Sequence, residues 1–169
     1  MQNSSLLLKQ VTVGDLNQIA ELAKIIWQKH YPSIIGQEQV DYMLNKIYNL
    51  ESLIDQIKNK NQQYYFIQSY NENVGFLSVT PENSDCWMLN KFYVLEEKAG
   101  KGLGTLILQE LKKIICPKKI RLTVNRNNIK SINFYFKNGF KIESTAIFDI
   151  GDGYIMDDFI MVWESVNSR

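Results

Sequence analysis

The chain has 169 residues, of which 45% are hydrophobic and 22% are charged, and its formal net charge is +1. This length fits a single domain over residues 1–169, and the apolar content is enough for a core without disulfides or a metal. A net charge so close to zero gives no sign of a nucleic-acid-binding or membrane-surface protein. The composition and charge are compatible with a small-molecule enzyme or an interaction domain, and they do not decide between these two classes.

The residue types that bind zinc are scarce. Cys86 and Cys116 lie far apart without a C-x-x-C spacing, and His30 is the only histidine. A zinc site needs about four nitrogen or sulfur ligands, so we expect no metal. No apolar run approaches the roughly 20 residues of a membrane span, and no basic stretch precedes the short apolar run near the N-terminus. We therefore expect a cytoplasmic protein without a membrane partner.

The first third of the chain is predicted to be one strand followed by helices. The strand covers residues 6–11. A helical pattern begins at Asp15, and Pro32 ends it because proline disfavours helical backbone in the residue before it. Two further helices are expected over residues 37–48 and 50–58, where apolar residues recur on one face.

The rest of the chain alternates between strands and helices. We expect a hairpin of residues 64–69 and 74–79 around a turn at 71–73, a strand over 86–94, a helix over 102–115 that Pro117 ends, a strand over 119–124, a helix over 129–137, and strands over 140–148 and 156–164 around a turn at 151–153. The order β-α-α-α-β-β-β-α-β-α-β-β indicates an α/β (α+β) fold in which a mixed sheet has helices on its faces.

Three alternating glycines, Gly100, Gly102 and Gly104, lie between the strand over 86–94 and the next helix. Glycine lets a ligand approach main-chain N–H groups, and a helix N-terminus binds phosphates through its unpaired N–H groups and its dipole. Lys98 and Lys101 add positive charge. The spacing fits neither a P-loop nor a dinucleotide fingerprint. The turn therefore predicts a pyrophosphate cradle, and the alternative is a strand-to-helix turn without a ligand.

This turn resembles the CoA-binding signature of the GNAT acyltransferase superfamily, Q/R-x-x-G-x-G/A. Gly102 and Gly104 fall at the two small positions, and Ala99 replaces the Gln or Arg, which removes one side-chain contact but leaves the main-chain cradle. A second segment resembles the family's block V-N-x-x-N-x-x-A-x-x-x-Y-x-x-x-G-F. It matches at Val124, Asn125, Asn128, Tyr135, Gly139 and Phe140, with Ser131 at the small position. The resemblance implies the GNAT fold, with a mixed, mostly antiparallel sheet of six to seven strands, and acetyl-CoA as cosubstrate.

In this family the pantetheine of CoA lies against free backbone of the fourth strand, here around residues 92–94. A main-chain N–H at Val94 or Leu95 is then placed to stabilise the tetrahedral oxyanion. Asn128 bonds the pantetheine or caps the helix that follows it, and the sequence leaves both roles open. The cofactor-binding residues that the resemblance implies are Phe92, Tyr93, Val94, Leu95, Ala99, Gly100, Lys101, Gly102, Leu103, Gly104, Thr105, Asn125, Asn128, Ser131 and Tyr135.

Tyr135 is predicted to be the general acid. The thiolate that an amine expels from a thioester has a conjugate acid of pKa about 8.5, and a tyrosine hydroxyl of pKa about 10 can protonate it. The alternative is a core aromatic residue between Phe134 and Phe136. The base is not identified, because Met88 stands where histone-type relatives have a glutamate. A water chain held by Asn90, or a carboxylate from elsewhere, would have to serve.

The acceptor is predicted to be a primary amine. From about Leu6 to Trp163 the chain resembles a bacterial GNAT subgroup similar to polyamine N-acetyltransferases, which implies that residues 30–43 and 150–158 lie at the acceptor end. A polycation favours acidic surroundings, although each carboxylate could also be a solvated surface group. The substrate-binding candidates are His30, Tyr31, Asp41 and Asp157, with Asp158 beside them.

The predicted function is therefore transfer of acetyl from acetyl-CoA to a small primary amine, such as a polyamine, by direct attack in a ternary complex. Two alternatives stay open at this point. One is an enzyme of the same class that modifies a protein N-terminus or lysine, and the other is a CoA-binding module with weak or no turnover. The resemblance also suggests a homodimer.

Overall fold

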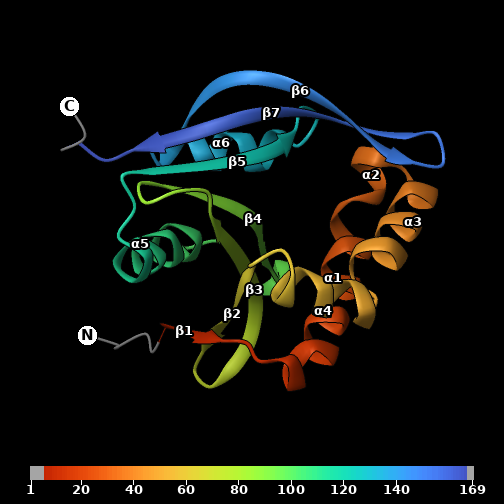
Figure 1. The fold of residues 1–169 in the computed structure, drawn as a ribbon, viewed down its shortest axis with the longest axis horizontal. Helices are drawn as coiled ribbons and strands as arrows, with labels where there is room; N and C mark the ends of the chain where they lie inside the picture. Colours follow the sequence, from red (N-terminus) through yellow and green to blue (C-terminus); the bar gives the residue numbers. More distant parts are fainter. Residues whose placement is uncertain (1–5, 167–169) are drawn as a thin grey trace. The chain divides into compact units, whose positions relative to one another are not determined.

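The computed structural model describes residues 6–166 (Figure 1). Its strands are β1 (Leu6–Gln10), β2 (Gln63–Ser69), β3 (Glu72–Pro81), β4 (Cys86–Val94), β5 (Lys119–Asn125), β6 (Lys141–Gly151) and β7 (Tyr154–Glu164). Its helices are α1 (Leu16–His30), α2 (Pro32–Ile35), α3 (Gln37–Ile47), α4 (Leu50–Lys58), α5 (Leu103–Ile115) and α6 (Ile129–Lys137), with single 3-10 turns at Val13–Asp15 and Glu96–Lys98.

The seven described strands hydrogen-bond in the order β1-β2-β3-β4-β5-β7-β6. The strands β4 and β5 are parallel, whereas β1–β2, β2–β3, β5–β7 and β6–β7 are antiparallel. This is the mixed, mostly antiparallel sheet that the GNAT resemblance predicted. None of the helices within residues 6–166 has the length and apolar character that a membrane span requires.

The chain divides into two compact units, and β4 contributes to both. The first unit consists of the chain up to Thr80 together with Lys91–Cys116. The second consists of Pro81–Asn90 together with the chain from Pro117 onward. The prediction of a single domain over residues 1–169 stays a prediction.

The first unit is built around the apolar faces of its helices. The helix α1 buries Leu16, Ile19 and Trp27, and α5 buries Leu108 and Leu111, because these residues recur every three or four positions. The strands β2 and β3 are buried on both faces, since nearly all of their central residues are shielded from solvent. The core of this unit therefore lies where these strands meet the helices.

Gly75 brings the backbone of β3 unusually close to that of β4. A Cβ atom at this position would lie 2.2 Å from the carbonyl oxygen of Tyr93 and 2.9 Å from the Cα of Val94. Only a residue without a side chain permits this approach. Gly75 therefore fixes the course of β4 at the residues for which the family resemblance implies a role in binding pantetheine.

Besides the first part of β4, the second unit contains the long hairpin β6–β7, the strand β5 and the helix α6, which lies alongside β5 and β7 in Figure 1. The helix buries Ile132 and Tyr135. Immediately after it, a Cβ at Gly139 would lie 3.4 Å from Cδ1 of Trp163 on β7. These contacts hold α6 against the strand pair.

The structure departs from the predicted elements at several turns, among them those at Pro32 and at residues 151–153. Pro32 ends α1 as predicted, but it also begins α2, because the first helical position tolerates proline without loss of a hydrogen bond. The last hairpin turns more tightly than predicted, since Asp152 and Gly153 both have positive φ and β7 already begins at Tyr154. Positive φ at two consecutive positions is typical of a two-residue hairpin turn.

The two cysteines differ in exposure. Cys86 is buried, its thiol donates to a carboxylate oxygen of Glu82 at 3.0 Å, and its pKa is raised to about 11, chiefly by burial. Cys116 is exposed and ends α5 with a left-handed backbone (φ 45°).

Candidate active site

The predicted pyrophosphate cradle is an exposed loop that leads into α5. Gly100, Lys101 and Gly102 have φ values of 97°, 50° and 79°, so the backbone is left-handed at three consecutive residues. The N–H of Leu103 donates to the carbonyl of Gly100, and helical bonding begins with Leu106 donating to Gly102. Among the described residues, no acceptor is assigned to the N–H groups of Gly104 and Thr105. Unpaired N–H groups at the start of a thirteen-residue helix suit a phosphate.

The charges near this loop differ from the sequence expectation. Lys98 forms an ion pair with Glu72 at 2.9 Å, and this partner raises the pKa of the lysine. Lys98 therefore already has an ionic partner within the chain, whereas the sequence analysis predicted that its charge would be available to the phosphates. Ala99 and Lys101 are exposed at the loop. Of the two lysines, Lys101 is therefore the remaining candidate for a phosphate contact at the N-terminus of α5.

One of the two predicted oxyanion donors is already occupied. The N–H of Leu95 donates to the carbonyl of Val74 at 2.8 Å. This corrects the expectation that either Val94 or Leu95 could provide the donor, because a hydrogen bond to the neighbouring strand leaves the Leu95 N–H unavailable. Val94 remains the candidate donor, and Phe92, Tyr93 and Val94 are all partly exposed.

The aromatic residue Tyr31 from the predicted acceptor region meets Tyr93 from the predicted cofactor strand. Their ring centroids are 6.2 Å apart, and Tyr31 also stacks on Trp27 at 4.5 Å. His30 packs edge-on against Tyr31, with centroids 4.9 Å apart. The first unit therefore joins two acceptor candidates to one cofactor candidate through aromatic contacts.

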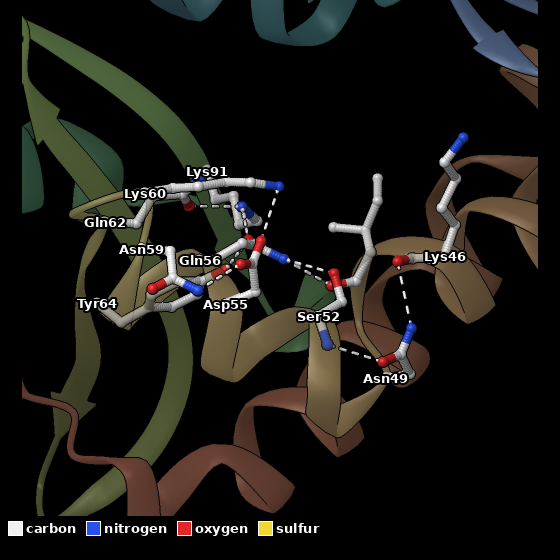
Figure 2. Close-up of polar contacts among 11 residues, drawn as sticks. Lys46, Asn49, Ser52, Asp55, Gln56, Asn59, Lys60, Gln62, Tyr64 and Lys91 are labelled. Carbon is white, nitrogen blue, oxygen red and sulfur yellow. Dashed lines mark hydrogen bonds and ion pairs between the residues drawn. The ribbon is translucent and has the colours of Figure 1, made fainter.

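Beside these residues, β4 carries a buried lysine that the sequence analysis did not single out. Figure 2 shows Lys91 together with Gln56 of α4 and Gln62, which precedes β2. The Lys91 ammonium donates to the side-chain oxygens of Gln56 at 2.7 Å and Gln62 at 2.9 Å. The hydroxyl of Tyr64 donates to the same Gln56 oxygen at 2.7 Å, and the lysine nitrogen lies 5.2 Å from the Tyr64 ring centroid.

Lys91 is only 8% exposed, and burial lowers the pKa of its amine to about 7, with a further contribution from the positive charge of Lys60. The amide and hydroxyl groups around it fasten β4 to α4 and to the segment that leads into β2. The only sequence signal for this role is a charged residue inside a largely apolar strand.

The segment between β5 and α6 carries the second group of candidates. Asn125 ends β5 and accepts a hydrogen bond from the N–H of Asn127 at 2.9 Å. Asn128 accepts a bond from the N–H of Ser131 at 3.2 Å, so this side chain caps α6. Capping was one of its two predicted roles, and a contact with pantetheine stays a prediction.

Tyr135 lies on the buried face of α6, with 8% of its surface exposed. Its ring packs edge-on against Phe134 and Phe140, with centroids 5.2 and 5.3 Å away. These contacts limit the rotamers of the ring and give its hydroxyl a defined position. These contacts suit a general acid, whose hydroxyl must be held in position, and they equally suit the alternative of a core aromatic residue.

The acidic acceptor candidates have distinct surroundings. Asp41 is exposed on α3, and its Oδ1 accepts bonds from the side-chain amides of Gln28 at 2.8 Å and Gln37 at 2.9 Å. Asp157 pairs with Arg126. A carboxylate that already has a guanidinium partner is poorly suited to hold a polycation, so Asp157 is a weaker candidate than the sequence indicated.

Asp158 is the most buried of the acidic candidates, with 3% exposed surface. Its pKa is raised to about 6, first by burial and then by the charge of Asp157, against a lowering hydrogen bond from Thr123. A carboxyl group with such a pKa exchanges its proton near neutral pH.

Comparison with known proteins identifies the class. A model described as the acetyltransferase (GNAT) family matches residues 19–140, so the chain belongs to this family. It is therefore an acetyltransferase, an enzyme whose acyl donor is acetyl-CoA.

Individual relatives support this assignment. The spermidine N(1)-acetyltransferase of Thermoplasma acidophilum is 29% identical over 160 residues, which cover 90% of this chain and 96% of the relative. The crystal structure of PaiA N-acetyltransferase from Thermoplasma acidophilum in complex with coenzyme A matches with a TM-score of 0.79 and 26% identity, covering 95% of this chain and 99% of that one. A GCN5-related N-acetyltransferase from Rhodopseudomonas palustris shares the fold, with a TM-score of 0.78, 16% identity, and coverage of 98% and 99%.

Proposed function

We propose that this enzyme transfers the acetyl group of acetyl-CoA to a primary amine of a small polyamine by direct attack in a ternary complex. The observation that carries the choice of acceptor is the 29% identity over nearly the full length of both chains to a relative named for spermidine N(1)-acetylation. In this proposal, the loop from Ala99 to Thr105 holds the pyrophosphate on main-chain N–H groups. The partly exposed segment of β4 around Phe92 and Val94 receives the pantetheine.

Tyr135 is the proposed general acid, because it lies on a packed ring platform within the family's second motif. As the amine nitrogen bonds to the thioester carbon, the carbon–sulfur bond breaks and the sulfur takes a proton from the tyrosine hydroxyl. Asn90, partly exposed on β4, is proposed to orient water at the same site. His30 and Tyr31 are proposed to contact the acceptor.

The test is a turnover assay that follows CoA thiol release from acetyl-CoA with spermidine, spermine, single amino acids and short peptides. We expect release that requires a polyamine, with an acetylated polyamine identified by mass spectrometry. Tyr135→Phe should lower kcat about 100-fold or more while the variant still binds acetyl-CoA. Release with peptides alone would favour a protein acetyltransferase, and binding without release for any amine would favour a CoA-binding module.

A further inference from the structure

Asp158 is a buried carboxylate whose environment leaves one oxygen without a partner. Its side chain is 3% exposed, and within residues 6–166 its Oδ1 has no hydrogen-bond donor. Arg126, the cation on the neighbouring segment, is paired with Asp157 instead. A carboxylate buried without a cation is costly, and protein interiors usually supply one. The free oxygen of Asp158 therefore fits a positively charged group that does not belong to the chain.

The sheet register places this carboxylate beside the second GNAT motif. Asp158 on β7 is the Cα partner of Asn125, the last residue of β5, and Asn128 and α6 follow directly in the chain. Residues paired across strands point to the same face of a sheet. Met88 on β4 is paired with Arg121, which lies four residues before Asn125 and so shares its face. Met88 stands where histone-type relatives have a glutamate. The face of the sheet that carries Met88 thus bears the carboxylate of Asp158, which β7 contributes.

We propose that Asp158 is the catalytic base, which receives the acceptor's ammonium group at its free Oδ1 and takes a proton from the nitrogen. This proposal rests on the proposed function, in which the acceptor is a primary amine. Asp158 then supplies the proton acceptor for the reaction, because Met88 on β4 has no group that can take a proton.

The ammonium nitrogen gives one proton to the Asp158 carboxylate and uses the freed electron pair to form the bond to the thioester carbon. The carbon–sulfur bond then breaks and its electron pair goes to sulfur, which takes a proton from Tyr135. The nitrogen loses its second proton to restore the tyrosine, and Asp158 releases its proton to water. The net reaction gives an amide, a free thiol and one proton.

The surroundings of Asp158 in the second unit suit this role. From β5 it faces Thr123, which donates a hydrogen bond to it and is itself exposed, and from β6 it faces Ala146. On its own strand the neighbouring Asp157 adds negative charge. Burial and this charge together hold the pKa of Asp158 at about 6, so the carboxylate is ionised and able to accept a proton at neutral pH.

The experiment compares the wild type with Asp158→Asn in pH profiles of kcat/KM for spermidine at saturating acetyl-CoA. The wild-type profile should fall as pH drops through about 6. Asp158→Asn should lower kcat/KM about 100-fold at pH 7. Its deficit should shrink with rising pH, because the fraction of neutral amine grows tenfold per pH unit below the amine's own pKa. Asp158→Glu, which keeps a carboxylate, should recover part of the activity.

Two further measurements separate a catalytic from a structural role. Asp85→Asn, at an exposed position that pairs with Lys118 and lies outside the candidate site, makes the same chemical change and should leave the profile unchanged. The melting temperature of Asp158→Asn at pH 7 should equal or exceed that of the wild type, because a buried lone charge is removed, and acetyl-CoA binding should persist. A folded Asp158→Asn enzyme with a wild-type pH profile would overturn the proposal. If no amine supports turnover in the wild type, the proposed function fails instead.

Discussion

Gly102 occupies the N-terminal cap of α5 with a φ of 79°, and a Cβ placed there would meet no atom within 4 Å. An alanine at this position would cost about 1–2 kcal/mol of backbone strain without a clash inside the protein. The open space above it is where the proposed pyrophosphate must approach. The same methyl group would therefore obstruct a ligand even though the chain itself has room for it.

We accordingly expect Gly102→Ala to raise the dissociation constant of acetyl-CoA about tenfold or more, with a modest fall in melting temperature. Isothermal titration calorimetry measures the affinity. Gly153→Ala is a matched control, because Gly153 has a φ of 78° and equally open surroundings in the β6–β7 turn. The control should lose similar stability and keep full affinity. Equal affinities in the two variants would argue against a cradle at this loop.

The strand β4 is held in place by two features of different kinds. Gly75 sets its distance from β3, and Lys91 ties it to α4 through the amide oxygen of Gln56. Burial of Lys91 makes the free energy of unfolding depend on pH. Its pKa is about 7 in the folded protein and ordinarily 10.5, so between these values the unfolded chain binds a proton that the folded chain does not. Stability should therefore rise as pH increases from 7 towards 10.5 and should not depend on this group below pH 7.

Lys91→Met tests this linkage. Between pH 7 and pH 9.5 the lysine should add roughly 3 kcal/mol to the unfolding free energy of the wild type, at 1.36 kcal/mol per pH unit. The methionine variant should lack this gain, while Lys58→Met, at an exposed position on α4, should keep it. Urea unfolding at the two pH values gives the free energies. A gain in Lys91→Met as large as in the wild type would show that Lys91 titrates normally.

Helices and strands that are marked by local sequence features, such as a capping residue or a regular apolar pattern, were predicted well. The bounds of α4, α6 and β4 agree with the sequence interpretation, because Asn49 and Asn128 cap the two helices and the apolar pattern of each is regular. The helix α2 was not predicted, since four residues after a proline give too short a pattern to read. The hairpin over residues 151–153 was expected, but its register depends on positive φ at Asp152, which sequence does not specify.

The candidate site was predictable to the extent that it consists of contiguous motifs. The glycine loop was identified from the spacing of its glycines, and the segment from Asn125 to Tyr135 was identified from its resemblance to the family's second motif. The contacts of Lys91 join residues 35 and 29 positions apart, so no local pattern reveals them. The pairing of Asp157 with Arg126 likewise spans 31 positions. Strand pairing decides that Asp157, and not Asp158, forms the ion pair with Arg126. The sequence could only indicate both aspartates as acidic candidates.

The strand β6 forms one end of the sheet order and exposes apolar side chains on its hairpin. Ile147 is 68% exposed and Ile155 is 53% exposed, and Phe148 is also exposed. A strand at the edge of a sheet that also carries exposed apolar side chains is a surface that another strand covers readily. A second copy of β6 supplies a matching edge through a two-fold axis, which is the commonest symmetry of homodimers.

The predicted homodimer is therefore expected to form through β6. Sedimentation velocity should give a dimer for the wild type and a monomer for Ile147→Lys, since a lysine pair across the axis would repel. Ile25→Lys is the control, because Ile25 is an apolar residue on α1 with 55% exposure. It should remain a dimer. A monomeric wild type at micromolar concentration would contradict this interface.

Cys116 gives the chain a single site for chemical labelling. The protein has two cysteines, and the buried one, with its pKa of about 11, is protonated and shielded at neutral pH. A maleimide dye should therefore attach once, at the C-terminal end of α5. Thirteen helical residues separate that end from the glycine loop, a distance of about 20 Å along the axis. A fluorophore there would not block the loop, and the enzyme could be attached to a surface through it with the glycine loop pointing away from the support.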